Sequence, residues 1–210
     1  KDIAQILEEY FAVKEEEQKV PLVSEVIDIN HTKEYEDLTI HKVNEHTRAY
    51  IKIQDGCNQF CSYCIIPYTR GRIRSKNPEE VIEEVKNLAA QGYKEIVLTG
   101  IHLSSYGKDL GDITLLDVIQ RIQQIEDIER IRLGSLEPRI ITEQFVKELR
   151  ACDKVCPHFH LSLQSGCDET LKRMNRKYTT EEYETALNVL RTYYEHPALT
   201  TDVIAGFVGE

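Results

Sequence analysis

The sequence has no run of about eighteen apolar residues, so it offers no candidate for a membrane-spanning helix. Its first residues, 1–9, mix charged and apolar positions as a helix does, which differs from a secretory signal peptide. The formal net charge of −10 argues against a surface that binds nucleic acid indiscriminately. We therefore expect a cytoplasmic protein without a membrane partner.

The six cysteines are not spaced as a disulfide framework, because Cys57, Cys61 and Cys64 lie together at C-x3-C-x2-C spacing. This clustering suits a reducing compartment. The three residues follow an apolar-alternating segment, 49–54, and a turn at 55–56. Three thiolates on one loop can converge on a 4Fe-4S cube and leave one iron open to a substrate or cofactor, whereas electron carriers usually supply four thiolates.

The three clustered cysteines also allow a zinc site or simple burial. A structural zinc site normally needs a second pair of ligands, but Cys152 and Cys156 lie about ninety residues further along the chain. Three free cysteines can also be buried as small hydrophobic residues. We favour the cluster because the thiols lie on a loop that directly follows a predicted strand.

Charge is distributed unevenly along the chain. Residues 1–47 carry 5 Lys and Arg against 12 Asp and Glu, whereas residues 48–76 carry 6 against 1. The arginines that follow the cysteines could bind the phosphates of a polyanionic substrate. They could equally pair with nearby acids, and the sequence favours neither alternative.

Strand and helix patterns alternate from about residue 46 onward. Asn77 and Pro78 predict the start of a helix that Gly92 ends, and Thr179 with Glu182 predicts a capping box. Further helices are expected over 115–125 and 143–149. The predicted strands cover residues 49–54, 95–100, 130–135, 158–164 and 200–206.

Alternating strands and helices predict an α/β fold with a parallel sheet, either doubly wound or curled into a barrel that five strands would leave incomplete. In both folds the ligand site lies at the carboxyl ends of the strands, where the cysteine loop also falls. We assign residues 1–45 to the tail of a preceding domain and a linker, and residues 46–210 to the core domain, incomplete at its C-terminus.

Together these motifs resemble the radical S-adenosylmethionine (SAM) enzymes, and within them the methylthiotransferases that modify tRNA or a ribosomal protein. The resemblance runs from about residue 26 to the end and implies a radical SAM core, a partial TIM-like barrel truncated at about five strands. It rests on residues 55–67 (Asp55-Gly-Cys-Asn-Gln-Phe-Cys-Ser-Tyr-Cys-Ile-Ile-Pro), 70–72, 97–100, 163–166, 171–178 and 202–207.

The resemblance implies that the three clustered cysteines bind a 4Fe-4S cluster whose open iron is chelated by SAM. One electron would then cleave the sulfonium, and the resulting radical would abstract hydrogen from an unactivated carbon that receives a thiomethyl group. The cofactor-binding residues implied are Tyr63 near the adenine, Thr99 and Gly100 at the amino end, Ser135 and Glu137 as polar contacts, Gln164 and Asp202 at the ribose, and Arg176 at a carboxylate. We assign His102, His158 and His160 to packing or strand faces.

The family also has an N-terminal domain, in which three further cysteines hold a second 4Fe-4S cluster, and a C-terminal RNA-binding domain. Residues 1–45 contain no cysteine, so we expect that N-terminal domain to be absent here. The family signature Gly-Phe-Pro-Gly-Glu reads Gly206-Phe-Val-Gly-Glu in this chain.

Within the family, residues 53–64 and 71–74 look most like the enzymes that add a methylthio group to N6-threonylcarbamoyladenosine beside the tRNA anticodon. The alternatives are isopentenyladenosine in tRNA and an aspartate of a ribosomal protein. The implied partners are the tRNA anticodon loop and a low-potential electron donor such as flavodoxin.

Two functions of different classes compete with this hypothesis. An iron–sulfur electron carrier or redox sensor needs a fourth thiolate, for which Cys167 is the candidate. A zinc-stabilised binding module would lose its fold on chelation. Neither needs the polar and glycine-containing strand ends that are predicted here.

Overall fold

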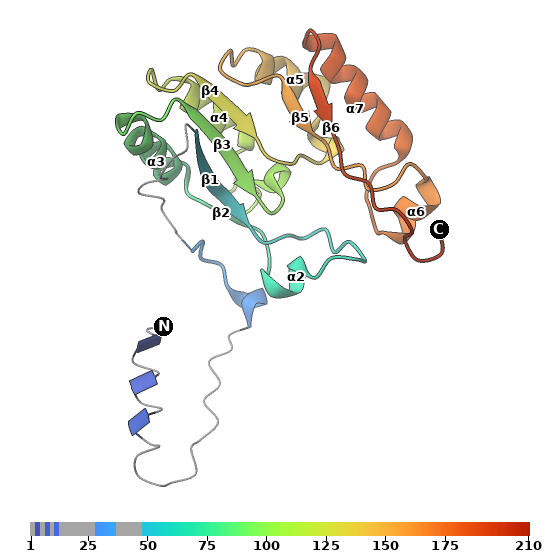
Figure 1. Cartoon of the computed structure of the whole chain (residues 1–210), viewed down its shortest axis with the longest axis horizontal. Helices are drawn as coiled ribbons and strands as arrows, with labels where there is room; N and C mark the ends of the chain where they lie inside the picture. Colours follow the sequence, from blue (N-terminus) through green and yellow to red (C-terminus); the bar gives the residue numbers. More distant parts are fainter. Residues whose placement is uncertain (1–2, 5–6, 9–10, 13–27, 37–47) are drawn as a thin grey trace.

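A sheet of short parallel strands forms the centre of the protein. The computed structural model describes residues 3–4, 7–8, 11–12, 28–36 and 48–210. Strand β1 (Arg48–Asp55) pairs in parallel with β3 (Glu95–Gly100), and β3 pairs in parallel with β4 (Arg130–Leu133) (Figure 1). Strand β2 (Arg74–Ser75) pairs with β1 in the antiparallel sense, which gives the order β2-β1-β3-β4.

The sheet continues toward the C-terminus as a second parallel pair, β5 (His158–His160) and β6 (Ala198–Thr200). Isolated bridges from Ile131 to Val155 and from Leu136 to Leu161 connect this pair to β4 and the segment that follows it. The strands therefore curl into a half-barrel, which confirms the predicted α/β class and partial barrel. The antiparallel β2 was not predicted.

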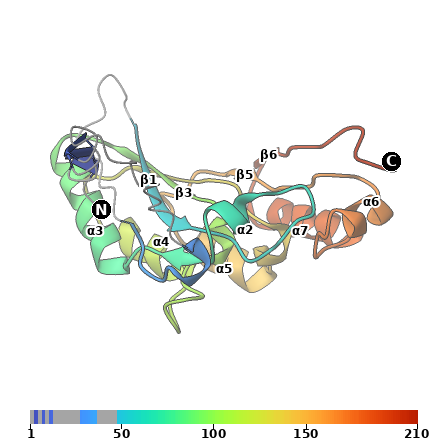
Figure 2. The ribbon, with the colours of Figure 1, turned by 90° about the horizontal axis from the view of Figure 1, so that it is seen from below.

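The longer helices lie along one side of the strands (Figure 2). They are α3 (Pro78–Ala90), α4 (Leu115–Gln123), α5 (Glu143–Arg150) and α7 (Thr180–Tyr193). The predicted caps are confirmed: Asn77 accepts a hydrogen bond from the Glu79 backbone, and Thr179 forms a capping box with Glu182. The sequence did not predict the shorter elements α2 (Ile66–Thr69), α6 (Asp168–Arg173), η1 (Ile29–His31), η2 (Leu103–Ser105) and η3 (Pro138–Ile140).

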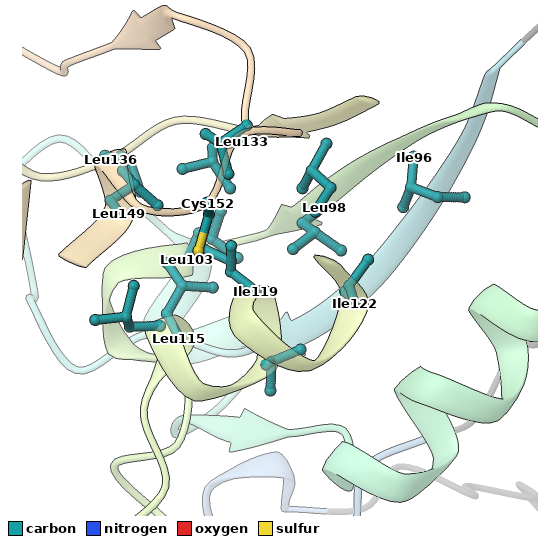
Figure 3. Close-up of a cluster of buried hydrophobic side chains, with 14 of the residues drawn as sticks. Ile96, Leu98, Leu103, Leu115, Ile119, Ile122, Leu133, Leu136, Leu149 and Cys152 are labelled. Carbon is teal, nitrogen blue, oxygen red and sulfur yellow. The ribbon is translucent and has the colours of Figure 1, made fainter. Parts of the chain in front are cut away.

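The core fills the space between the strands and these helices (Figure 3). Ile96 and Leu98 of β3 are fully buried against a stripe on α4 that includes Ile119 and Ile122. Such a stripe is what covers one face of a sheet. Cys152 belongs to the same cluster at 5% exposure, so it packs as a small hydrophobic residue.

Several predicted elements end earlier or lie elsewhere in the structure. Strand β4 ends at Leu133 and β5 ends at His160, and β6 covers residues 198–200 rather than 200–206. Gln164 itself has a φ of 70°, which is incompatible with extended backbone, and it pairs with Val203 only as an isolated bridge. Helix α4 ends at Gln123, two residues before the predicted end at residue 125.

The N-terminal region is described only in part. Residues 3–4, 7–8 and 11–12 are helical, as the sequence predicts, and Ile3, Leu7 and Phe11 are about half exposed or more. The predicted boundary near residue 45 lies outside the described residues and stays a prediction.

Candidate functional site

The cysteine loop is anchored where β1 ends, at the buried carboxylate of Asp55. Its Oδ1 accepts hydrogen bonds from the Gly56 amide at 2.8 Å and from Arg70 Nε at 3.2 Å. Its Oδ2 accepts from Lys52 Nζ at 3.1 Å and from Arg70 Nη2 at 3.0 Å. Burial alone would raise the pKa of Asp55, but these donors outweigh it and lower the pKa below the ordinary value. A charged carboxylate thus fixes the start of the loop.

Two glycines allow the strand ends to approach closely at this point. Gly56 has a φ of +69°, and a Cβ there would lie 1.8 Å from the carbonyl oxygen of Arg72. A Cβ on Gly100 would lie 2.9 Å from Cβ of Gln54. The Gln54 side chain uses this space to donate to the carbonyl oxygens of residues 55 and 56 and to accept from the His102 amide at 2.7 Å.

The far side of the loop is held by a segment more than a hundred residues later. Ser62 donates from its amide to the Met174 carbonyl at 3.0 Å, and its hydroxyl donates to the Arg173 carbonyl at 2.8 Å. Asn175 Nδ2 donates to the Phe60 carbonyl at 2.7 Å. Phe60 has a φ of 52°, so these contacts hold it in a left-handed conformation that side chains other than glycine rarely adopt.

The three thiols line one cavity of about 190 Å³ between the loop and the carboxyl ends of the strands. No described cysteine forms a disulfide, and Cys57 is buried, which raises the pKa of its thiol. Within the described ranges, no group of three or more His, Cys, Asp or Glu side chains closes on a single metal ion. Three thiols around a shared hollow suit a multinuclear cluster better than a lone zinc ion. Larger hollows of about 730 and 700 Å³ contain none of these thiols.

A half-buried cation lies against the thiols. Arg176 Nη1 is 3.3 Å from Cys61 Sγ, and Arg176 Nε donates to the Tyr178 hydroxyl at 3.0 Å. Burial opposes the charge of Arg176, but Tyr178 and Cys61 outweigh it and raise the pKa of the guanidinium. Burial also raises the pKa of Tyr63, in the same wall, to about 12. Arg176 therefore places a permanent positive charge beside the cysteine sulfurs.

A carboxylate also lines the cavity. Glu137 is 7% exposed; its Oε1 accepts from Arg139 Nε at 2.7 Å, and its Oε2 lies 3.5 Å from His102 Nε2. Burial would raise the pKa of Glu137, but His102 and Arg139 outweigh it and lower the pKa to about 2. The second ring nitrogen of His102 lies 2.6 Å from the Ser105 hydroxyl, which fixes the ring.

Five of the eight residues expected at the cofactor line this cavity together with the three cysteines: Tyr63, Ser135, Glu137, Gln164 and Arg176. The remaining three do not line it. Thr99 donates from its hydroxyl to the Ile51 carbonyl at 3.1 Å, Gly100 accommodates Gln54, and the 78% exposed side chain of Asp202 lies 3.4 Å from His160 Nε2. Their contacts with a cofactor stay predictions.

Sequence reasoning did not assign several residues of the cavity wall: Gln59, Ile66, Ile101, His102, Leu136 and Ser162. His102 was expected to pack, yet its Nε2 also lies 3.5 Å from the Gln59 side chain. Its position two residues after β3, at the carboxyl edge of the sheet, is the signal that could have identified it. Cys167, the candidate fourth thiolate, is exposed at the start of α6 and is not part of the wall.

Comparison with known proteins identifies related chains. The model of the radical SAM superfamily matches residues 51–210. The chain is 48% identical over 170 residues to the tRNA-2-methylthio-N(6)-dimethylallyladenosine synthase of Thermoanaerobacter sp. (strain X514), covering 80% of this chain and 36% of that protein. It is 43% identical over 198 residues to the threonylcarbamoyladenosine tRNA methylthiotransferase MtaB of Bacillus subtilis (strain 168), covering 94% of this chain and 43% of that protein. The chain thus spans less than half the length of these two relatives.

Solved structures agree in fold. The cobalamin-dependent S-adenosylmethionine radical enzyme OxsB matches 74% of this chain and 23% of its own, with a TM-score of 0.60 and 16% identity. The radical S-adenosylmethionine methyltransferase TsrM from Kitasatospora setae matches 74% of this chain and 30% of its own, with a TM-score of 0.57 and 20% identity. No helix among the described residues has the length and apolar composition needed to cross a membrane.

Proposed function

The chain belongs to the radical SAM superfamily, and from that premise we propose that it adds a methylthio group to N6-threonylcarbamoyladenosine beside the tRNA anticodon. The observation that carries the proposal is the set of three unpaired thiols around one cavity, with Arg176 against them. The substrate is supported by MtaB, whose name states this tRNA activity and whose similarity covers 94% of the chain.

The donor set fits the cofactors that the superfamily uses. Cys57, Cys61 and Cys64 would hold a 4Fe-4S cluster, because three thiolates leave one iron for SAM. When bound, the cluster and SAM supply one-electron cleavage of a sulfonium and removal of a hydrogen atom from the substrate. The 210 residues contain no second set of clustered cysteines, so the second 4Fe-4S cluster expected of a methylthiotransferase would need ligands from outside them.

The protein's own side chains would bind and orient the two cofactors and shield them from water. Arg176 offsets the negative charge of the thiolates, and Gln54, Asp55 and Asn175 hold the loop that carries them. Tyr63 would cover the adenine, with Ile101 and Leu136 helping to exclude water. The polar groups available to SAM in the same wall are Ser135, Glu137, Ser162 and Gln164, and we retain Thr99, Gly100 and Asp202 as contacts expected by resemblance.

Two further methylthiolation substrates stay open. Dimethylallyl (isopentenyl) adenosine is favoured by the relative from Thermoanaerobacter, which carries that substrate in its name. An aspartate of a ribosomal protein is the third candidate. In each case we propose a cytoplasmic enzyme and a low-potential electron donor such as flavodoxin. The electron-carrier alternative is disfavoured because Cys167 does not line the cavity.

The test is anaerobic reconstitution with iron and sulfide, followed by electron paramagnetic resonance of the reduced protein with and without SAM. We expect a 4Fe-4S signal that changes on addition of SAM, is lost in Cys61→Ala and is kept in the matched control Cys167→Ala. A signal indifferent to SAM would mean four protein ligands and would favour an electron carrier.

The substrate needs a second assay, in which tRNA is incubated with the reduced protein and its nucleosides are analysed by mass spectrometry. Methylthio-N6-threonylcarbamoyladenosine is the expected product. Methylthio-isopentenyladenosine, or a modified ribosomal protein, would replace the proposed substrate and leave the radical SAM chemistry standing.

A further inference from the structure

An exposed aromatic cluster lies beside the cavity, on residues that the proposed cofactor chemistry does not use. The rings of Phe60 and Tyr68 meet edge to face, with centroids 5.5 Å apart. The guanidinium of Arg72 lies 4.6 Å from the centroid of the Phe60 ring. The side chain of Tyr68 is 61% exposed, and that of Ile65, three residues earlier, is 65% exposed. We name Phe60, Tyr68 and Arg72 the stacking platform.

The platform adjoins the cysteines through short stretches of chain. Phe60 directly precedes Cys61, and Tyr68 lies on α2, whose first residue, Ile66, is part of the cavity wall. The conformation of Phe60 is held by Asn175 and is therefore set before any ligand binds. A ligand on the platform would lie at the edge of the thiol-lined hollow.

The charge of this region is positive although the chain as a whole is acidic. Arg70 and Arg74 share the single carboxylate of Asp55 with Lys52, so three cations face one anion. Lys76 pairs with Glu84, at 2.8 Å. Arg72 has no carboxylate partner within the part of the chain that the structure describes, and its side chain is exposed. The charges of Arg70, Arg74 and Lys76 are thus at least partly neutralised by carboxylates, whereas the charge of Arg72 is not.

We propose that the stacking platform binds an unpaired RNA nucleotide next to the one that is modified, with its base on Tyr68 or on the plane of Arg72 and its phosphate near Arg70. The proposal rests on the proposed tRNA function and names how that substrate is held. A nucleotide that enters a buried cavity leaves its neighbour without a stacking partner. Aromatic rings and guanidinium planes replace that partner in single-stranded RNA recognition, and cations beside them bind the backbone.

A peptide is the competing occupant, since aromatic residues also bind proteins. Charge favours RNA, because Arg72 lies over the Phe60 ring without a carboxylate partner among the described residues, and Arg70 shares the carboxylate of Asp55 with two other cations, on a chain of net charge −10. Peptide binding would need apolar anchoring in a pocket, whereas the Tyr68 ring stands open on the surface.

The test measures binding of a fluorescent tRNA anticodon stem-loop, by anisotropy, to the anaerobically reconstituted protein. Because stacking contributes roughly 1–3 kcal/mol per base, we expect Tyr68→Ala to weaken binding about 5- to 150-fold and Tyr68→Phe to change it less than about twofold. Arg72→Ala should weaken binding and reduce its dependence on salt. The matched control is Tyr50→Ala, because Tyr50 is 43% exposed beneath Arg48 at 5.7 Å but lies at the start of β1, away from the cysteine loop.

The outcomes separate the platform from the enzyme. The SAM-dependent cluster signal should persist in Tyr68→Ala, so lost RNA binding with an intact signal supports the platform. Wild-type affinity in Tyr68→Ala, an equal loss in Tyr50→Ala, or equal weakening for a fully paired duplex would overturn it. A ribosomal-protein peptide that binds in a Tyr68-dependent manner would identify the competing occupant instead. A cluster that ignores SAM while RNA still binds through Tyr68 would refute the proposed function and leave the platform standing.

Discussion

Replacing Gly56 with alanine should destabilise the protein far more than the same change at Gly92. Both glycines have positive φ, +69° and +94°. A left-handed conformation costs an L-residue about 1–2 kcal/mol, so both variants carry that cost. They differ in the space around the new methyl group, because nothing lies within 4 Å of a Cβ on Gly92.

The Gly56 methyl group would meet backbone, which cannot rotate aside as the end of a flexible side chain can. Its Cβ would lie 1.8 Å from the Arg72 carbonyl oxygen, so the two segments must separate. That movement breaks bonds that join the segments, including the 3.0 Å bond from the Cys57 amide to the Gly71 carbonyl and the 3.0 Å bond from Arg70 Nη2 to Asp55 Oδ2. At about 0.5–1.5 kcal/mol for a neutral bond and about 1.5–3 kcal/mol for a charged one, together with the cost of the positive φ, the total reaches about 3–6 kcal/mol.

Urea denaturation followed by circular dichroism gives the free energies of unfolding, and iron content after reconstitution gives a second readout. We expect Gly92→Ala to lose about 1–2 kcal/mol and keep its iron, and Gly56→Ala to lose about 3–6 kcal/mol and most of its iron. Equal losses in the two variants would refute the reasoning, because the cost would then come from φ alone.

Three further predictions concern charged groups. Arg176→Gln removes a cation 3.3 Å from Cys61, so the reduction potential of the reconstituted cluster should fall; Arg176→Lys should restore most of it, and an unchanged potential in potentiometric titration would contradict the electrostatic role. The pKa of Glu137 is about 2 against an ordinary 4.5, so its carboxylate contributes about 3 kcal/mol above pH 5, and that contribution is lost as the pH falls toward 2. Urea titrations of the wild type and Glu137→Gln should therefore differ at pH 7 and converge near pH 2, and parallel curves would argue against it. Lys76→Met leaves the buried carboxylate of Glu84 without its 2.8 Å ion pair and should cost about 3–5 kcal/mol in the same assay, much of which Lys76→Met/Glu84→Leu should recover.

Much of the fold was predictable because its signals are local. The caps at Asn77 and Thr179 depend on residues two or three positions away, and buried parallel strands such as β3 appear as apolar runs. The positions where strands end were harder to predict. Strand β5 stops short of Gln164, and no neighbouring residue type indicates the positive φ of Gln164. Strand β2 is two residues long, which is too short to show an alternation of apolar and polar residues.

The site was predictable as a set of strand ends, and less so as a set of contacts. The cysteine spacing and the rule that strand ends meet at one edge of a parallel sheet predicted that Ser135, Glu137 and Gln164 lie near the cysteines, and all of them line one cavity. The partners of each group depend on the tertiary structure: Glu137 pairs with Arg139 and His102, and although His102 follows a predicted strand, no local pattern indicates that its ring lies against Glu137. The same limit applies to Asp202, which is at a strand end yet faces solvent.

The hydrogen bonds that residues 173–175 make with the cysteine loop also have a consequence for the order of events during biosynthesis. Phe60 and Ser62 are held by residues 173–175, which leave the ribosome more than a hundred residues later. At about 5–20 residues per second, the thiols wait on the order of 5–25 s before their loop can close. During that interval they are open to oxygen and to stray metal ions, so the proposed cluster would be inserted after the synthesis of α6. Nascent chains arrested before residue 172 should accordingly be alkylated at these cysteines much faster than chains released beyond residue 176.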